Sequence, residues 1–246
     1  MSDNNGIYNR DLERINRRKN FMKNMKVTLI TAISTIAVVL LVLWTLTGIF
    51  SLHKIKVSGD SMYPNLLNNE GVYTYKVPKW YPKAINPMPN GEYQRGEVVV
   101  FNANNVDPRE QQHNMYYVKR IIGKPGDTVS FKNNKLYVNN KVVNQNFISH
   151  SEATTGSNGP QGQKSWDIKS LATNTSSPES VWNAQSNKLL RTTNFVIPSH
   201  MYFVMGDHRS VSNDSRYYGL VSDNDILGIV HVNVSHNKDK VNNVRF

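Results

Sequence analysis

The sequence predicts a mostly β domain behind one N-terminal membrane-spanning helix. The run from Val27 to Phe50 contains no charged residue, and the chain beyond it consists largely of short segments rich in Val, Ile, Tyr and Phe. At 246 residues the chain can hold an anchor and one domain with a sizeable core. Cysteine is absent, so disulfides and thiolate sites are excluded.

The apolar run is long enough to serve as a retained anchor. At about 1.5 Å per helical residue, residues 27–50 cross a hydrocarbon core of roughly 30 Å. The core helix of a soluble protein is the alternative, but such helices seldom run this long without a polar face. A cleaved signal peptide would need a shorter apolar region and small residues soon after it, and residues 50–53 are a poor match.

Basic residues precede this anchor and predict its orientation. By the positive-inside rule, residues 1–26 are cytoplasmic, residues 27–50 span the plasma membrane, and residues 51–246 form the extracytoplasmic domain. The net charge of +11 would also suit a nucleic-acid partner, but no basic run is interleaved with stacking aromatics. We therefore predict anionic membrane lipid, and no nucleic acid, as the partner of the basic flank. The basic residues are Arg14, Arg17, Arg18, Lys19, Lys23 and Lys26.

Eight segments of the domain are predicted to be strands, and Asn pairs between three of them favour tight turns in a small meander. The segments are 72–77, 97–103, 115–123, 127–131, 135–139, 195–199, 201–207 and 226–234. Two stretches look inserted: residues 77–94, with several prolines, and about 150–192, where Ser, Thr, Asn, Gly and Gln dominate. The second is either a flexible excursion or a small subdomain around Trp166 and Trp182.

The stretch SGDSMYP, residues 58–64, presents Ser61 shortly after the anchor. On its own, Ser61 could be a turn serine bonded to its own backbone. However, Gly59 permits a tight turn and Pro64 disfavours helix at Tyr63, so the hydroxyl could be displayed beside backbone N–H groups able to hold an oxyanion. A hydroxyl becomes an effective nucleophile only when a base takes its proton.

Lys119 is the first candidate for that base. Strand alternation places it on one face with Tyr117 and Ile121, where burial would lower its pKa and leave a neutral amine. The structural alternative is that Lys119 faces solvent and Arg120 faces the core.

His208 is the rival base, because Asp207, His208 and Asp214 share one loop and could form a Ser/His/Asp triad with Ser61. The same polar loop, Gly206 to Gly219, is either a long turn or a support for the site. In the second case, the Ser212 hydroxyl would contact the lysine amine, and an Asp214/Arg216 pair would fix the loop.

In this order, and after an N-terminal anchor, four stretches resemble the boxes of bacterial type I signal peptidases in their Gram-positive form. They are GDSMYPNL, RGEVVVF (95–101), YYVKRIIGKPGD and MGDHRSVSNDSRYYG. The resemblance covers the anchor and most of residues 55–147 and 195–230. It implies a signal-peptidase-like β domain and a membrane-anchored serine endopeptidase that removes signal peptides from exported preproteins, with no metal or cofactor. Nothing in the sequence requires more than a monomer.

The resemblance also implies residue roles. Ser61 would be the nucleophile and Lys119 the general base, while Ser212 would orient the lysine. The backbone N–H groups of Gly59 and Ser61 would hold the oxyanion. The remaining implied roles belong to a supporting ion pair and to a shallow pocket for small substrate side chains: Asp214, Arg216 and Met62.

This chain departs from the family pattern in the C-terminal box. It has His208-Arg209-Ser210-Val211 where many members have Asn-Arg-Asp-Asn. This departure leaves open a catalytically silent, membrane-anchored homologue that binds exported chains without cutting them. A self-cleaving Ser/Lys regulator is a further alternative, but such regulators act on DNA-bound cytoplasmic partners, which the anchor opposes.

Overall fold

The computed structural model describes residues 4–50, 52–75, 92–107, 115–173, 182, 188, 190–231, 238–242, 244 and 246. The chain divides into two compact units, residues 1–50 and 51–246. The predicted insert at 77–94 lies almost wholly outside the described residues.

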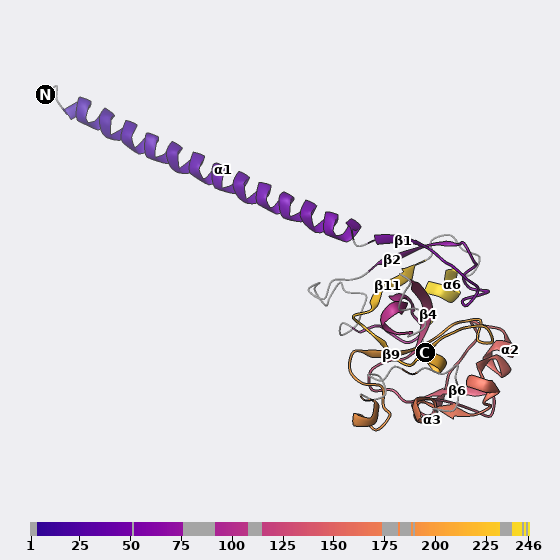
Figure 1. The fold of residues 1–246 in the computed structure, drawn as a ribbon. Helices are drawn as coiled ribbons and strands as arrows, with labels where there is room; N and C mark the ends of the chain where they lie inside the picture. Colours follow the sequence, from indigo (N-terminus) through magenta and orange to yellow (C-terminus); the bar gives the residue numbers. More distant parts are fainter. Residues whose placement is uncertain are drawn as a thin grey trace. The chain divides into compact units, whose positions relative to one another are not determined.

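The first unit is one continuous helix, α1 (Asn4–Phe50), shown in Figure 1. Its stretch from Glu13 to Thr45 is long and apolar enough to cross a membrane. Several hydroxyl side chains lie within it, and each donates to a backbone carbonyl three or four residues earlier: Thr28, Thr31, Ser34, Thr35 and Thr45. These bonds satisfy the hydroxyl donors inside the helix, as a lipid environment requires.

The second unit is mostly β, as the sequence predicts. Its larger sheet has seven antiparallel strands, with β4 near the centre next to β3 and β9. In spatial order the strands are β1 (Leu52–Lys56), β2 (Gly71–Tyr75), β11 (Ile226–His231), β3 (Val98–Asn102), β4 (Tyr116–Gly123), β9 (Met201–Met205) and β10 (Val221–Ser222).

The smaller sheet contains the predicted meander. Asn133 and Asn134 have φ of 51° and 57°, the left-handed conformation that a two-residue hairpin turn needs, and Asn139 and Asn140 repeat it at the next turn. In spatial order its strands are β7 (Lys141–Val142), β6 (Lys135–Val138), β5 (Val129–Lys132) and β8 (Trp166–Asp167).

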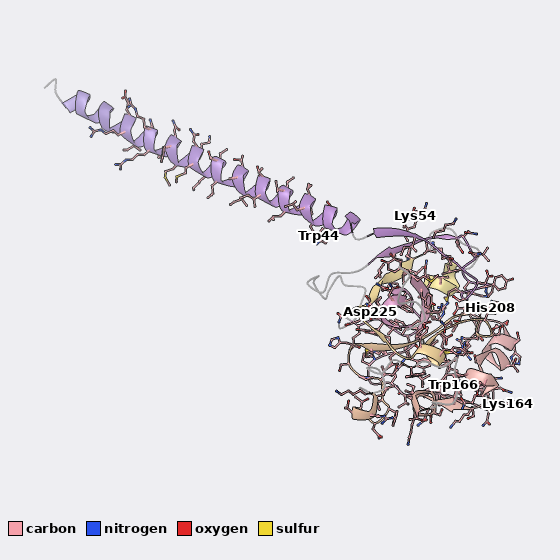
Figure 2. The ribbon with its side chains drawn as sticks, viewed as in Figure 1. Trp44, Lys54, Lys164, Trp166, His208 and Asp225 are labelled. Atoms are coloured by element: carbon pink, nitrogen blue, oxygen red, sulfur yellow. The ribbon has the colours of Figure 1, made fainter. Side chains whose placement is uncertain are left out.

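The described part of the 150–192 insert is a packed subdomain. It contributes β8, α2 (His150–Ala153), α3 (Ile168–Thr173) and two 3₁₀ turns, Thr155–Ser157 and Pro160–Gly162. Trp166, labelled in Figure 2, is buried. Its ring stacks on those of Phe131 and Phe203 at centroid distances of 5.9 Å and 5.8 Å. The insert therefore closes the core of the smaller sheet.

The predicted strand at 195–199 is wrong. Phe195 has a φ of +62° and Pro198 has no N–H, so neither fits a strand ladder. Only Ile197 pairs, through its N–H to Asp127 and its carbonyl to Gly126. The other seven segments each contain a strand, whereas β1, β7, β8 and β10 were not predicted. Three of those four strands are two residues long, too short for a pattern of alternation.

Both faces of β4 are covered by core clusters. Tyr117 and Ile121 pack on one side, while Val118 and Ile122 pack in clusters on the other. The alternative in which Lys119 faces solvent is therefore wrong, because the Lys119 side chain is buried; Arg120 is also buried, as that alternative expected.

Arg120 is compensated by Asp207. Its Nε and Nη2 donate to the two carboxylate oxygens of Asp207 at 2.8 Å and 2.6 Å, and both side chains are fully buried. Asn65 Nδ2 also donates to Asp207. This pair joins β4 to the segment that follows β9. Two further helices complete the described fold: α5 (Ser215–Tyr218) and α6 (Lys238–Asn242).

We expect Arg120→Met to lower the free energy of unfolding by about 3–5 kcal/mol, because it leaves the Asp207 carboxylate buried without its cation. Lys124→Met, which breaks the more exposed pair with Glu92, should cost less than about 1 kcal/mol. Urea unfolding of the full chain in detergent measures both. The double variant Arg120→Met/Asp207→Leu should regain much of the loss; equal costs for the two single variants would contradict this account.

Candidate active site

A serine and a lysine from distant parts of the chain meet at the centre of the larger sheet. Lys119 lies in the middle of β4, opposite Val99 of β3. Its Nζ lies 2.8 Å from the Oγ of Ser61, which stands in the turn after β1. This is the one hydrogen bond of the Ser61 side chain within the described part of the chain. The structure thus brings together the two residues that the sequence singled out.

The surroundings of Lys119 oppose its positive charge. The side chain is buried, and its Nζ lies over the Tyr117 ring, 5.0 Å from the centroid, and 3.1 Å from the carbonyl of Val118. Burial lowers the pKa of Lys119 from 10.5 to about 8, although Asp214 and Asp207 partly oppose this shift. A substantial fraction of the amine is therefore neutral near neutral or mildly alkaline pH, and a neutral amine can accept a proton from the hydroxyl.

The turn that carries Ser61 is held by its own hydrogen bonds. Gly59 has a φ of +86°, which favours glycine, and its N–H donates to Asn68 Oδ1 at 3.2 Å. The N–H of Tyr63 donates to the carbonyl of Asp60 at 3.0 Å. Because the Gly59 N–H is already bonded, the N–H of Ser61 is the more available of the two predicted oxyanion donors: within the described residues it donates to no group.

The loop after β9 packs directly on this turn at Gly206. A Cβ at Gly206 would lie 2.4 Å from the Ser61 carbonyl oxygen and 2.2 Å from Ser212 Oγ. Only a residue without a side chain fits between these groups. His208, two residues after Gly206, adds a hydrogen bond to this contact, since its backbone N–H donates to the same Ser61 carbonyl at 3.0 Å.

Asp214 and Arg216 fix the far side of this loop. Asp214 caps α5 and lies 2.9 Å from the Nε of Arg216, and both side chains are buried. Burial would raise the pKa of Asp214, but the charge and hydrogen bonds of Arg216 outweigh it, so the pKa is lowered. Arg216 also donates to the carbonyls of Gly156 and Asn158, which ties the loop to the insert.

Three residues singled out in the sequence do not make the contacts that their predicted roles require. Ser212 is buried, yet its hydroxyl has no hydrogen-bond partner among the described residues, so the expected bond to Lys119 is not formed. Met62 is 1% exposed and packs with Val57 and Leu66, so it can shape a pocket only through the residues that cover it. The His208 ring contacts the carbonyl of Asp60 instead of the Ser61 hydroxyl.

The alternative triad is not assembled. Asp207 is paired with Arg120, and Asp214 with Arg216, so neither carboxylate orients the imidazole. The described residues contain no group of three or more His, Cys, Asp or Glu side chains that could hold a metal ion.

Several supporting residues were not predicted. Asn65 donates to Asp207 and to the carbonyl of Phe147, and Glu152 of α2 accepts from the N–H and hydroxyl of Ser210. Arg209, buried, donates to Gln145 and Ser157. Glu152, Gln145 and Ser157 each lie more than fifty residues from the loop residue that they contact, so no local pattern could connect them to it.

The lowered pKa of Lys119 makes a prediction about stability. Because the folded value of about 8 lies below the unfolded value of 10.5, the unfolded chain binds more protons between these pH values, and stability rises with pH across this window. At about 1.4 kcal/mol per pKa unit, the rise is at most about 3 kcal/mol.

Lys119→Met should abolish this rise, which is measured by urea unfolding of the full chain in detergent from about pH 7 to pH 10.5. Lys132→Met changes an exposed lysine and should leave the pH dependence as it is. Parallel curves for the wild type and Lys119→Met would contradict a depressed lysine pKa.

Comparison with known proteins identifies the family. A family model described as signal peptidase, peptidase S26, matches residues 29–234. Signal peptidase IB of Staphylococcus aureus strain Mu50 is 34% identical over 191 residues, which cover 77% of this chain and 81% of that protein. Signal peptidase I P of Bacillus subtilis subsp. natto is 30% identical over 193 residues, covering 77% and 80%.

Among solved structures, a signal peptidase I from Enterococcus faecalis V583 is 24% identical and aligns with a TM-score of 0.39, over 56% of this chain and 95% of that one. The family model spans most of the described domain and the apolar part of α1, and the match to the S. aureus relative covers 77% of the chain. The chain belongs to the signal peptidase family, peptidase S26.

Proposed function

We propose that this protein removes signal peptides from exported preproteins as a serine endopeptidase, with Ser61 as nucleophile and Lys119 as general base. The observation that carries the proposal is the 2.8 Å contact between Ser61 Oγ and the Nζ of a buried lysine. A hydroxyl needs an adjacent base, and a lysine can be that base only when its pKa is lowered toward the working pH.

The reaction follows from this geometry. Neutral Lys119 accepts the Ser61 proton as Oγ attacks the carbonyl carbon of the scissile bond. The ammonium then donates a proton to the leaving amine, and the part of the preprotein that follows the cut is released while the signal peptide stays bound to Ser61 as an ester. Water, deprotonated by the same amine, hydrolyses the ester and restores the free serine.

The N–H of Ser61 is proposed to hold the oxyanion of the tetrahedral intermediate. It is unpaired within the described residues, whereas the Gly59 N–H is bonded to Asn68. The Ser212 hydroxyl is proposed to accept a hydrogen bond from Lys119 once the ammonium forms. This hydroxyl is buried and unpartnered, which leaves it available for that bond.

The location of the reaction is proposed from the anchor and its charges. Ser61 follows Phe50 by eleven residues, so the nucleophile stays near the membrane surface where a preprotein tethered by its own signal segment emerges. The basic residues before the anchor favour a cytoplasmic N-terminus in contact with anionic lipid, and a domain of residues 51–246 outside the plasma membrane. One copy carries both Ser61 and Lys119, so the proposal requires only a monomer.

Ser61→Ala and Lys119→Met should each abolish cleavage of a preprotein with an Ala-x-Ala site, because the nucleophile and its base are each indispensable. Losses of at least about 10⁴-fold in kcat/KM are expected. Cleavage by the detergent-purified chain is followed by gel and mass spectrometry. His200→Ala, which alters a histidine bonded to Asp223, serves as the control and should cut at the wild-type rate. A folded but inert wild type would instead support the silent homologue.

The rate of cleavage should rise with pH through about 8, because only the neutral amine of Lys119 can act as base and its pKa is lowered to about 8. Below this value kcat/KM should fall by about tenfold per pH unit. The measurement is the initial rate on one preprotein over a range of buffers. A profile that is flat from mildly acidic to alkaline pH would contradict the Ser/Lys dyad.

A further inference from the structure

His208, labelled in Figure 2, contacts the turn that carries Ser61 through its imidazole as well as through its backbone N–H. The ring Nδ1 is 3.1 Å from the carbonyl oxygen of Asp60, while the backbone N–H of His208 donates to the carbonyl of Ser61 at 3.0 Å. His208 therefore contacts the two successive carbonyls on either side of the Ser61 α-carbon. Neither the Ser/Lys chemistry nor the ion pairs of the loop account for the ring contact.

The carbonyl of Asp60 and the N–H of Ser61 belong to the same peptide group. That peptide is trans, since the only cis peptide within the described residues is Tyr63-Pro64. In a planar trans peptide the C=O and N–H bonds point in opposite directions. A donor that holds the Asp60 oxygen on one side therefore sets the direction in which the Ser61 N–H points on the other.

The contact requires that Nδ1 carries a hydrogen, because a carbonyl oxygen can only accept. Both the Nδ1–H tautomer of the neutral ring and the imidazolium meet this requirement. A hydrogen bond to the carbonyl also polarises the peptide and strengthens its N–H as a donor. The Tyr63 N–H donates to the same oxygen at 3.0 Å, so the position and donor strength of the Ser61 N–H depend on two donors, of which the imidazole is the one that a side chain supplies.

The ring is itself held by its neighbours. Its side chain is 27% exposed, with Nε2 at 4.0 Å from Glu152 Oε1. The Tyr63 ring lies 5.8 Å away, tilted by 49°. Glu152 accepts from both the N–H and the hydroxyl of Ser210, each at 2.8 Å, which anchors the loop two residues beyond His208. The insert thereby fixes the segment that presents the imidazole.

We propose that His208 is a positioning residue that orients and polarises the Asp60–Ser61 peptide, so that the Ser61 N–H is directed at the oxyanion. The inference rests on the proposed role of Ser61 as nucleophile. It assigns His208 no proton transfer. Its loss should affect the transition state, where the oxyanion exists, more than substrate binding.

The test uses side chains that differ in one atom. The Nδ2 of asparagine occupies the same place along the side chain as Nδ1 of histidine, and aspartate has the same shape with an oxygen that can only accept. His208→Asn should keep kcat within about threefold of wild type. His208→Asp and His208→Leu should lower kcat by about 10- to 100-fold and leave KM nearly unchanged. His150→Ala, an exposed histidine on α2, is the control and should not change either constant.

Thermal unfolding of each variant distinguishes a loss of activity caused by unfolding from one caused by a misoriented peptide. If His208→Leu unfolds at a lower temperature than wild type, the comparison of His208→Asn with His208→Asp decides the question. The inference is overturned if His208→Asp and His208→Leu cut at the wild-type rate, if His208→Asn loses as much as they do, or if the loss lies in KM. Ser61→Ala, assayed alongside, separates failure of the proposed function from failure of this inference. If Ser61→Ala is active, Ser61 is not the nucleophile and the proposed function itself fails. If Ser61→Ala is inert and the His208 variants are fully active, only the role of His208 is contradicted.

Discussion

The arrangement of this site depends on keeping the Lys119 amine out of water. The lysine lies on a central strand whose two faces are both covered, and burial is the largest influence on its pKa. The nearby carboxylates of Asp214 and Asp207 counteract this effect only in part, because neither is paired with the amine. Instead, Asp207 is bonded to Arg120 and Asp214 to Arg216. The buried arginines therefore do more than stabilise the fold, because they leave the lysine without an anionic partner to hold its proton.

A second constraint is the close approach of three chain segments around one glycine. The turn after β1 brings the nucleophile, β4 brings the amine, and the loop after β9 packs on the turn at Gly206, where a methyl group would meet both Ser61 and Ser212. The insert then holds this loop from outside through Glu152, Ser157 and the carbonyl of Gly156. A stretch that looks like a polar excursion in the sequence thus forms part of the frame of the active site.

The sequence was sufficient to predict the long apolar helix, seven of the strands and the Ser61–Lys119 contact, because each produces a local pattern or belongs to a box of the family. It was insufficient where contacts between distant parts of the chain determine the local structure or the partner of a side chain. The apolar run at 195–199 looks like a strand, yet the backbone at Phe195 and Pro198 cannot join a ladder. The charge compensation of Arg120 by Asp207 spans 87 residues, and the contact of Glu152 with Ser210 spans 58. No pattern of spacing could reveal either contact.

The choice of oxyanion donor also depends on a contact that the sequence pattern does not reveal. Gly59 and Ser61 were equally plausible donors in the sequence, and the side chain of Asn68, nine residues away, distinguishes them by taking the Gly59 N–H. Likewise, no pattern in the sequence predicts the contact of the His208 ring with the Asp60 carbonyl, because that contact depends on the packing of the loop after β9 against the turn.

The central claim is that Lys119 is a largely desolvated amine that loses its proton near neutral pH. The most direct measurement is an NMR titration of the Lys119 side chain, with ¹³C at Cε, in the full chain in detergent micelles, assigned by comparison with Lys119→Met. The account predicts a titration with a pKa of about 8, well below that of the exposed lysines in the same spectrum. A Lys119 resonance that titrates together with the exposed lysines would contradict it, and the serine would then need another base.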